Sequence, residues 1–123
     1  MLQFGIRLHD AVDVPIEERL PIIKEQGFTC AHVALSKVIK SNSVANEALT
    51  PGYAMYLKRL FEKNELDCAV LGCYLNLANP DEKQLRTTQD KYLANIRFAA
   101  HMGVGVVGTE TGAPNTEYKF EEA

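Results

Sequence analysis

The chain has 123 residues, of which 46% are hydrophobic and 24% charged, and its net charge at pH 7 is −3. This is the composition of an ordinary globular chain, and it excludes a disordered one. The acidic balance, without a Lys or Arg cluster, argues against a nucleic-acid-binding face. No apolar run approaches the roughly 20 residues that a membrane span needs. The length favours a single domain over residues 1–123.

The cysteines and the first residues bear on the compartment. The three cysteines are odd in number and show no CxxC spacing, which argues against a disulfide framework or a zinc site. The start of the chain, Met1 to Phe4, lacks the basic region and apolar core of a signal peptide. We therefore expect reduced thiols in a cytoplasmic protein.

Four apolar runs alternate with longer segments that have helical patterns. The runs are Leu2–Leu8, Cys30–Leu35, Cys68–Leu71 and Val104–Val107. A parallel strand can be reached only by a long crossover, so this alternation predicts an α/β fold of repeated parallel βα units. The pattern stops soon after the fourth run, where residues 118–122 are typical of the first turn of a further helix.

The first crossover helix is expected between Pro15 and Gln26, and Gly27 is expected to end it. Pro21 conflicts with this prediction, because a proline inside a helix costs about 3 kcal/mol. Either a kink at Pro21 or a helix that begins near Arg19 would remove the conflict, and the sequence leaves both open.

Residues 36–48 are polar and predict a long loop before the second helix. Thr50 followed by Pro51 predicts an N-cap and the first helical position. The apolar residues that follow recur at helical spacing and predict the face that packs on the sheet: Tyr53, Tyr56, Leu57, Leu60 and Phe61.

The third helix has the clearest predicted ends. Asn79 and Pro80 predict its N-cap and first position, and Gly103 predicts its end. His101 lies in the last turn, where a cation is mildly favoured, so we expect it to cap the helix. The buried stripe is predicted to be Leu85, Tyr92, Ile96 and Ala99.

Parallel α/β folds keep their chemistry just past the carboxyl ends of the strands. In a closed barrel these positions ring one mouth, where His9 and Glu110 could ligate a metal or move protons. A structural interpretation competes with this one, in which His9 caps a loop and Glu110 bonds within a glycine-rich turn. The residues at such positions are His9, Asp10, Ser36, Lys37, Cys73, Tyr74, Asn76 and Glu110.

Several segments, taken in order, resemble one family. The run Gly72–Pro80 resembles the third-strand exit of the xylose isomerase-like (β/α)8 superfamily, which includes sugar phosphate isomerases/epimerases and endonuclease IV-type DNA-repair enzymes. Residues 95–112 resemble that family's third helix and fourth strand, and Gly5–Leu8 and Glu25–Phe28 fit its first unit. The resemblance covers the whole chain. It implies the first half of a TIM barrel, with four strands and three full helices.

The resemblance implies isomerisation or epimerisation of a sugar, polyol or sugar phosphate by proton transfer next to a carbonyl. It also implies a divalent metal (Mn, Mg, Co or Zn), held mainly by carboxylates and histidine from strands beyond Ala123. Within this chain we expect Glu110 to be the catalytic and metal-binding residue. We expect His9, Tyr74 and Asn76 to bind the substrate.

Two positions depart from the family pattern. The repair-enzyme branch has a metal-binding histidine where Leu71 or Gly72 stands here, which, with the acidic charge, counts against a DNA-repair nuclease. A carboxylate often seen near the end of strand two is also missing, since Ala34 and Leu35 stand there. We expect a small-molecule substrate, with neither nucleic acid nor membrane as a partner.

A (β/α)8 barrel needs about 250 residues and eight strands, and this chain supplies four. The chain is a fragment of a longer enzyme, or two copies pair their half-barrels, or the strands form a small open sheet. Open strand edges invite association, so the last two cases predict a homo-oligomer. Two functions stay open: part of a sugar isomerase or epimerase, inactive alone, or a non-catalytic module that binds a small ligand or a partner chain.

Overall fold

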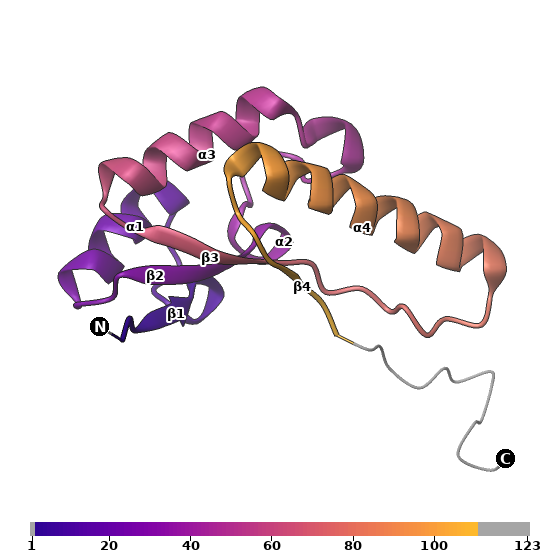
Figure 1. Cartoon of the computed structure of the whole chain (residues 1–123), viewed down its shortest axis with the longest axis horizontal. Coiled ribbons are helices and arrows are strands. Elements are labelled where there is room, and N and C mark those ends of the chain that lie inside the picture. The colour runs from indigo at the N-terminus through magenta and orange to yellow at the C-terminus, as the bar shows by residue number, and fades with distance from the viewer. Residues whose placement is uncertain (1, 111–123) are drawn as a thin grey trace, which may run out of the picture.

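The computed structural model describes residues 2–110, which form one parallel sheet with helices on one side (Figure 1). Neighbouring strands in the sheet are also neighbours along the chain, so every connection is a crossover. The α/β class and the parallel βα repeats predicted from the sequence are therefore confirmed. The strands are β1 (Gly5–Arg7), β2 (Cys30–Ala34), β3 (Asp67–Gly72) and β4 (Val107–Gly108), paired in this order.

Three long helices make the crossovers, and three short ones interrupt the loops at the strand ends. In Figure 1, α3 and α4 lie side by side above the sheet, and they are in contact. The long helices are α1 (Ile16–Glu25), α3 (Pro51–Lys63) and α4 (Glu82–Met102). The short ones are η1 (Leu8–Asp10), α2 (Leu35–Val38) and η2 (Asn46–Ala48).

The core lies between the sheet and these helices. Val33 and Leu71 of the strands pack against Leu20, Leu57 and Phe98 of the helices, and all five side chains are fully buried. Each contributes about 1.5–3 kcal/mol by leaving water. Because strand side chains alternate, the residues between these core positions face the other side of the sheet, away from the helices.

The ends of the helices follow local signals. Thr50 Oγ1 accepts a hydrogen bond from the backbone N–H of Tyr53 at 3.2 Å, and Pro51 takes the first helical position, as predicted. Gly27 and Gly103 have φ angles of +99° and +80°, a region that glycine enters without steric cost. Both residues follow the last turn of a helix, also as predicted.

The predicted start of α4 is wrong by two residues. Asp81, not Asn79, is the N-cap, and its Oδ1 accepts from the backbone N–H of Gln84 at 2.8 Å. Asn79 Oδ1 instead accepts from the N–H of Asp81 at 3.0 Å, which forms the turn that leads into the helix.

Two residues of the predicted buried stripes are exposed. Tyr56 is 45% exposed, because it lies on the flank of α3, where its hydroxyl donates to Glu17 Oε1 of α1 at 2.8 Å. Ile96 is 40% exposed, because the inner face of α4 is formed by a different set at helical spacing. That set is Asn95, Phe98, Ala99 and Met102.

Three other boundaries differ from the prediction. α1 begins at Ile16 and keeps Pro21 inside it, so a start near Arg19 is excluded. The loop at residues 36–48 is interrupted by α2 and η2. β4 begins at Val107, because the N–H of Val104 is used to close the end of α4 by donating to Ala99 O at 2.8 Å.

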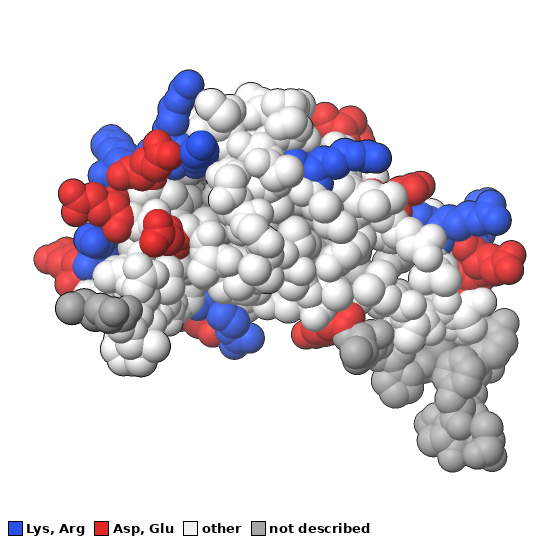
Figure 2. Space-filling model, in the orientation of Figure 1, with Lys and Arg blue, Asp and Glu red and all other residues white. Residues whose placement is uncertain are grey.

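The surface of the described part is mixed in charge. On the face shown in Figure 2, acidic and basic side chains are interspersed around the rim and leave an uncharged area in the middle. Among residues 2–110, no helix is both long and apolar enough to cross a bilayer. The predicted helix at residues 118–122 lies outside the described residues.

Candidate functional site

Three rings meet at the carboxyl ends of the first three strands, and we call His9, His32 and Tyr74 the mouth cluster. The ring centroids of His9 and His32 are 6.0 Å apart, and the Tyr74 centroid is 5.9 Å from each of them. His9 lies in η1 directly after β1, His32 lies in β2, and Tyr74 follows β3. Two of the predicted substrate-binding residues, His9 and Tyr74, are thus brought together.

The strand-end rule misses His32, because this residue lies within a strand and not after it. Its neighbours Ala31 and Val33 are buried under the helices, so strand alternation turns His32 to the opposite face. A polar residue between two buried apolar ones was the available signal. A β-carbon on Gly72 would lie 2.5 Å from His32 Cε1, so any other residue at this position would displace the ring.

Arg19 of α1 holds the loop that carries His9. Its side chain is only 2% exposed, and its Nη1 donates to the carbonyl oxygen of Leu8 at 2.9 Å. Its Nε and Nη2 donate to the carbonyl oxygen of Val14 at 3.0 and 2.8 Å. Nη2 also contacts Asp13 at 3.1 Å. One buried guanidinium therefore ties both ends of the loop between β1 and α1 to the helix.

Burial lowers the pKa of both imidazoles in the mouth cluster. For His9, loss of hydration is the largest cause, and the cations Arg7 and Lys37 also lower its pKa against an opposing effect of Asp10. For His32, loss of hydration again comes first and the neighbouring His9 second. Both rings are therefore neutral at pH 7. Their Nδ1 atoms are buried and have no hydrogen-bond partner among the described residues.

Two cations and one carboxylate flank the mouth cluster. Arg7 Nε donates to Asp10 Oδ2 at 2.7 Å, and this bond is the largest cause of a raised Arg7 pKa. Lys37 Nζ lies 5.5 Å from the centroid of the Tyr74 ring, within range of a cation–π attraction. Within residues 2–110, Lys37 makes no ion pair.

The other two predicted site residues lie at the same edge of the sheet, outside this cluster. Glu110 is exposed and follows β4 as the last described residue. Asn76 Oδ1 accepts from the N–H of Ala78 at 3.1 Å, so its side chain shapes the loop after β3. The roles of both residues in catalysis and binding stay predictions.

The described residues fit a metal ion poorly. Within residues 2–110, no group of three or more His, Cys, Asp and Glu side chains could hold one. Arg7 and Lys37 would also repel a dication placed at His9, because the charges of both already lower the pKa of this ring. The described residues alone therefore do not form a complete site for a metal ion.

A cavity of about 260 Å³ lies elsewhere, between the start of α1 and residues 38–42. Its lining includes Asp13, Lys40 and Tyr53, and burial raises the pKa of Tyr53. Asp13 and Lys40 already pair with each other at 2.8 Å. We place the functional site at the mouth cluster, because its three rings converge and the Nδ1 atoms of its two histidines have no hydrogen-bond partner within residues 2–110.

The parallel sheet with its crossover helices defines the class, namely α/β chains with a fold consistent with part of a TIM barrel. One solved structure with this fold is described as a xylose isomerase-like TIM barrel/4-hydroxyphenylpyruvate dioxygenase fusion protein. The match has a TM-score of 0.61 at 12% sequence identity, and covers 88% of this chain and 16% of that chain. This similarity shows the fold alone. No family model and no curated protein matches the sequence.

Proposed function

We propose that the chain is the amino-terminal part of a (β/α)8 enzyme that isomerises or epimerises a sugar or sugar phosphate by proton transfer next to a carbonyl. The observation that carries this proposal is the convergence of His9 and Tyr74, which follow strands, with His32 of β2, close to the edge of the sheet where TIM barrels place their catalytic residues. The similarity to a xylose isomerase-like barrel supports the fold that this site requires.

Neutral imidazoles suit this chemistry. The lowered pKa values of His9 and His32 keep both rings unprotonated near pH 7, so that each can bind a hydroxyl group or accept a proton. In the proposed reaction, the mouth cluster and Asn76 hold the oxygens of the substrate. Glu110 removes the proton from the hydroxyl-bearing carbon next to the carbonyl, which gives an enediolate whose oxyanion accepts a hydrogen bond from an imidazole N–H. Isomerisation follows when the protonated Glu110 returns this proton to the former carbonyl carbon and the hydroxyl proton of the neighbouring carbon passes to the enediolate oxygen. Epimerisation follows when a second acid returns a proton to the opposite face of the original carbon, and Glu110 keeps the proton that it removed until solvent takes it.

The rest of the barrel is part of the proposal. Four further strands would close the mouth and add the carboxylates that hold a divalent metal (Mn, Mg, Co or Zn). If Glu110 is itself one of these ligands, a carboxylate of the added strands replaces it as the base. Such a metal, when bound, polarises the carbonyl. The 123 residues alone are expected to be inactive. The free thiols of Cys30, Cys68 and Cys73 support a reducing, cytoplasmic setting.

Deuterium exchange tests the proposed chemistry. Aldoses, ketoses and their phosphates are incubated in D₂O with Mn²⁺ or Mg²⁺ and the native protein purified from its source. NMR then follows the C–H signal next to the carbonyl. We expect exchange with at least one sugar, slowed about 10²–10⁴-fold by Glu110→Gln. No exchange across the whole panel contradicts the proposal.

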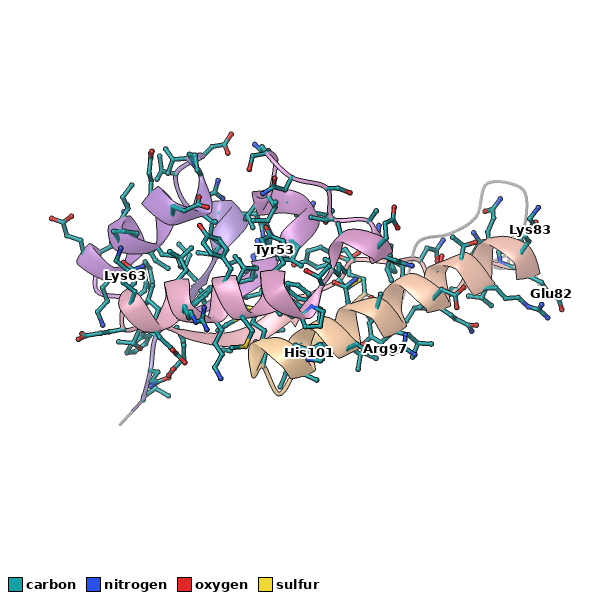
Figure 3. All side chains as sticks on the ribbon, turned by 90° about the horizontal axis from the view of Figure 1, so that it is seen from above. Tyr53, Lys63, Glu82, Lys83, Arg97 and His101 are labelled. Atoms are coloured by element: carbon teal, nitrogen blue, oxygen red, sulfur yellow. The ribbon has the colours of Figure 1, made fainter. Side chains whose placement is uncertain are left out.

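His101→Gln is the matched control for histidine variants in this assay. α4 runs antiparallel to the strands, so its last turn, which carries the exposed His101, lies at the end of the sheet opposite the mouth (Figure 3). Exchange should be unchanged in His101→Gln and reduced in His9→Gln. Equal losses in the two variants would mean that the mouth cluster has no special role.

The second candidate is a non-catalytic module that binds a partner chain through its sheet edges. Phe4 beside β1 is 68% exposed and Val106 beside β4 is 53% exposed, so both edges have apolar side chains in contact with water. The intact mass of the native protein separates the two candidates. A mass near twice 13.7 kDa supports the longer enzyme, whereas 13.7 kDa favours the module, and light scattering would then test for a homodimer.

A further inference from the structure

We infer that the mouth cluster, together with Arg7 and Lys37, binds an anionic group of the substrate, either a phosphate or a carboxylate. The inference deepens the proposed function and rests on it only for the identity of the substrate, because binding is measurable without turnover. Four observations carry it, concerning the lysine, the arginine, the imidazole nitrogens and the balance of charge.

Lys37 is a cation held beside the rings without a counter-ion. It lies in α2, the short helix that directly follows β2, and its Nζ is 5.5 Å from the centroid of the Tyr74 ring. Its positive charge also lowers the pKa of His9. No carboxylate of residues 2–110 lies within 4.0 Å of it. The nearby Lys40, in contrast, pairs with Asp13 at 2.8 Å. The chain therefore neutralises one lysine of this region and leaves the lysine at the site open to a ligand.

Arg7 keeps part of its guanidinium for a ligand. Its bond to Asp10 uses Nε, and its side chain is 57% exposed. A guanidinium presents its donors as a planar fork, which matches the oxygens of a phosphate or carboxylate. The terminal amino groups of Arg7 can therefore bind an oxyanion while Asp10 keeps the side chain in place.

The imidazoles add neutral donors. The Nδ1 atoms of His9 and His32 are closed to solvent and have no hydrogen-bond partner among the described residues, so a ligand reaches each ring through its other nitrogen, Nε2. A neutral imidazole has one N–H, and in the tautomer that carries it on Nε2 an oxyanion accepts from it. A ligand with several acceptor oxygens can therefore accept hydrogen bonds from both rings at once.

The charge balance selects an anion over a metal. A pair of histidines is a common metal-binding unit, but here Arg7 and Lys37 both repel a dication. Among residues 2–110, Asp10 is the carboxylate whose charge acts on both rings, and it is already bonded to Arg7. The same two cations attract an oxyanion. The site therefore favours a sugar phosphate or a sugar acid over a neutral sugar.

The test is a titration of the 123-residue chain with inorganic phosphate and, separately, with glycolate, at pH 7.5 and constant ionic strength set by NaCl. NMR follows the imidazole signals of the three histidines, with His101 as the internal control. We expect saturable shifts of the His9 and His32 signals and none for His101. A response to phosphate alone identifies a phosphorylated substrate, and a response to glycolate alone identifies a sugar acid.

Charge-removing variants locate the site. Arg7→Gln and Lys37→Gln should each weaken binding at least about tenfold. Lys63→Gln removes the same charge from the exposed last turn of α3, away from the mouth, and should leave binding unchanged (Figure 3). Because Lys37 is exposed and makes no ion pair with residues 2–110, its variant tests the site without unfolding the chain.

Three results would overturn the inference: no saturable shift with either anion, an equal loss in Lys63→Gln, or Zn²⁺ moving the His9 and His32 signals at lower concentration than either anion. The inference and the proposed reaction fail separately. Anion binding without deuterium exchange would support the anion site and refute the proposed isomerase or epimerase reaction. Deuterium exchange without anion binding would support the reaction and refute the anion site.

Discussion

Replacing Arg19 with methionine tests how the loop that carries His9 is held in place. Methionine keeps an unbranched apolar stem but removes every donor of the guanidinium. In the structure these donors bond to the carbonyl oxygens of Leu8 and Val14 at 2.8–3.0 Å, from a side chain that is 2% exposed. The substitution therefore leaves two carbonyl groups without their partner.

The expected loss of stability follows from these contacts. A buried polar group left unpaired costs about 1–3 kcal/mol, and the Val14 carbonyl, whose bonds are only partly buried, falls in the lower part of this range, about 1–2 kcal/mol. The ion pair with Asp13 adds little, because the Asp13 side chain is 71% exposed and such pairs contribute about 0–1 kcal/mol. Arg19→Met should therefore lower the free energy of unfolding by about 2–5 kcal/mol, a large share of the roughly 5–15 kcal/mol of a typical domain.

Urea denaturation followed by circular dichroism measures this loss. Arg59→Met is the matched control, because Arg59 is exposed on α3 and its variant should change stability by less than about 0.5 kcal/mol. The imidazole NMR signal of His9 should also move in Arg19→Met, because Leu8 directly precedes His9, while the signal of His101 stays. Equal losses in the Arg19 and Arg59 variants would refute the reasoning.

The mouth cluster and the partly buried Cys68 give three more expectations. Gly72→Ala should shift the His32 NMR signal and weaken phosphate binding, because the added carbon meets the ring, whereas Gly105→Ala, with no atom within 4 Å, should change neither. The free energy of unfolding should fall between pH 7 and pH 5. The pKa values of His9 and His32 are lowered in the folded chain, so on acidification the unfolded chain binds protons at a higher pH than the folded chain does. A decrease of the same size in His9→Gln and His32→Gln would contradict this reasoning. Burial raises the pKa of Cys68 to about 12. Because the thiolate is the reactive form, alkylation of Cys68 at pH 8 should be on the order of 10³-fold slower in the folded chain than in the chain unfolded by urea, as measured by mass spectrometry. Equal rates in the two states would contradict this prediction.

The local elements of this protein were largely predictable. The N-cap at Thr50 and the glycine that ends α4 at Gly103 act through bonds within a few residues, so their effect is visible in the sequence. The error at the start of α4 arose because two local signals competed. Both Asn79 and Asp81 can cap a helix, and only the folded loop shows which of them does so.

The candidate site was predictable only in part. His9 and Tyr74 follow strands, and the strand-end rule of parallel α/β folds identifies them without a structure. His32 was missed, because its role depends on which face of β2 the helices cover. Glu110 and Asn76 were identified by the same rule, and their roles await the experiments described above.

The sequence by itself determined the order of strands and helices and hence the parallel α/β class, because hydrophobic period and helix-end residues act locally. Only the tertiary structure decided that two imidazoles and a tyrosine meet at one edge of the sheet. It also decided that Arg19 is buried beneath the loop that carries His9. These contacts join residues far apart in the chain, and they exist only once the core has fixed how the helices lie on the sheet.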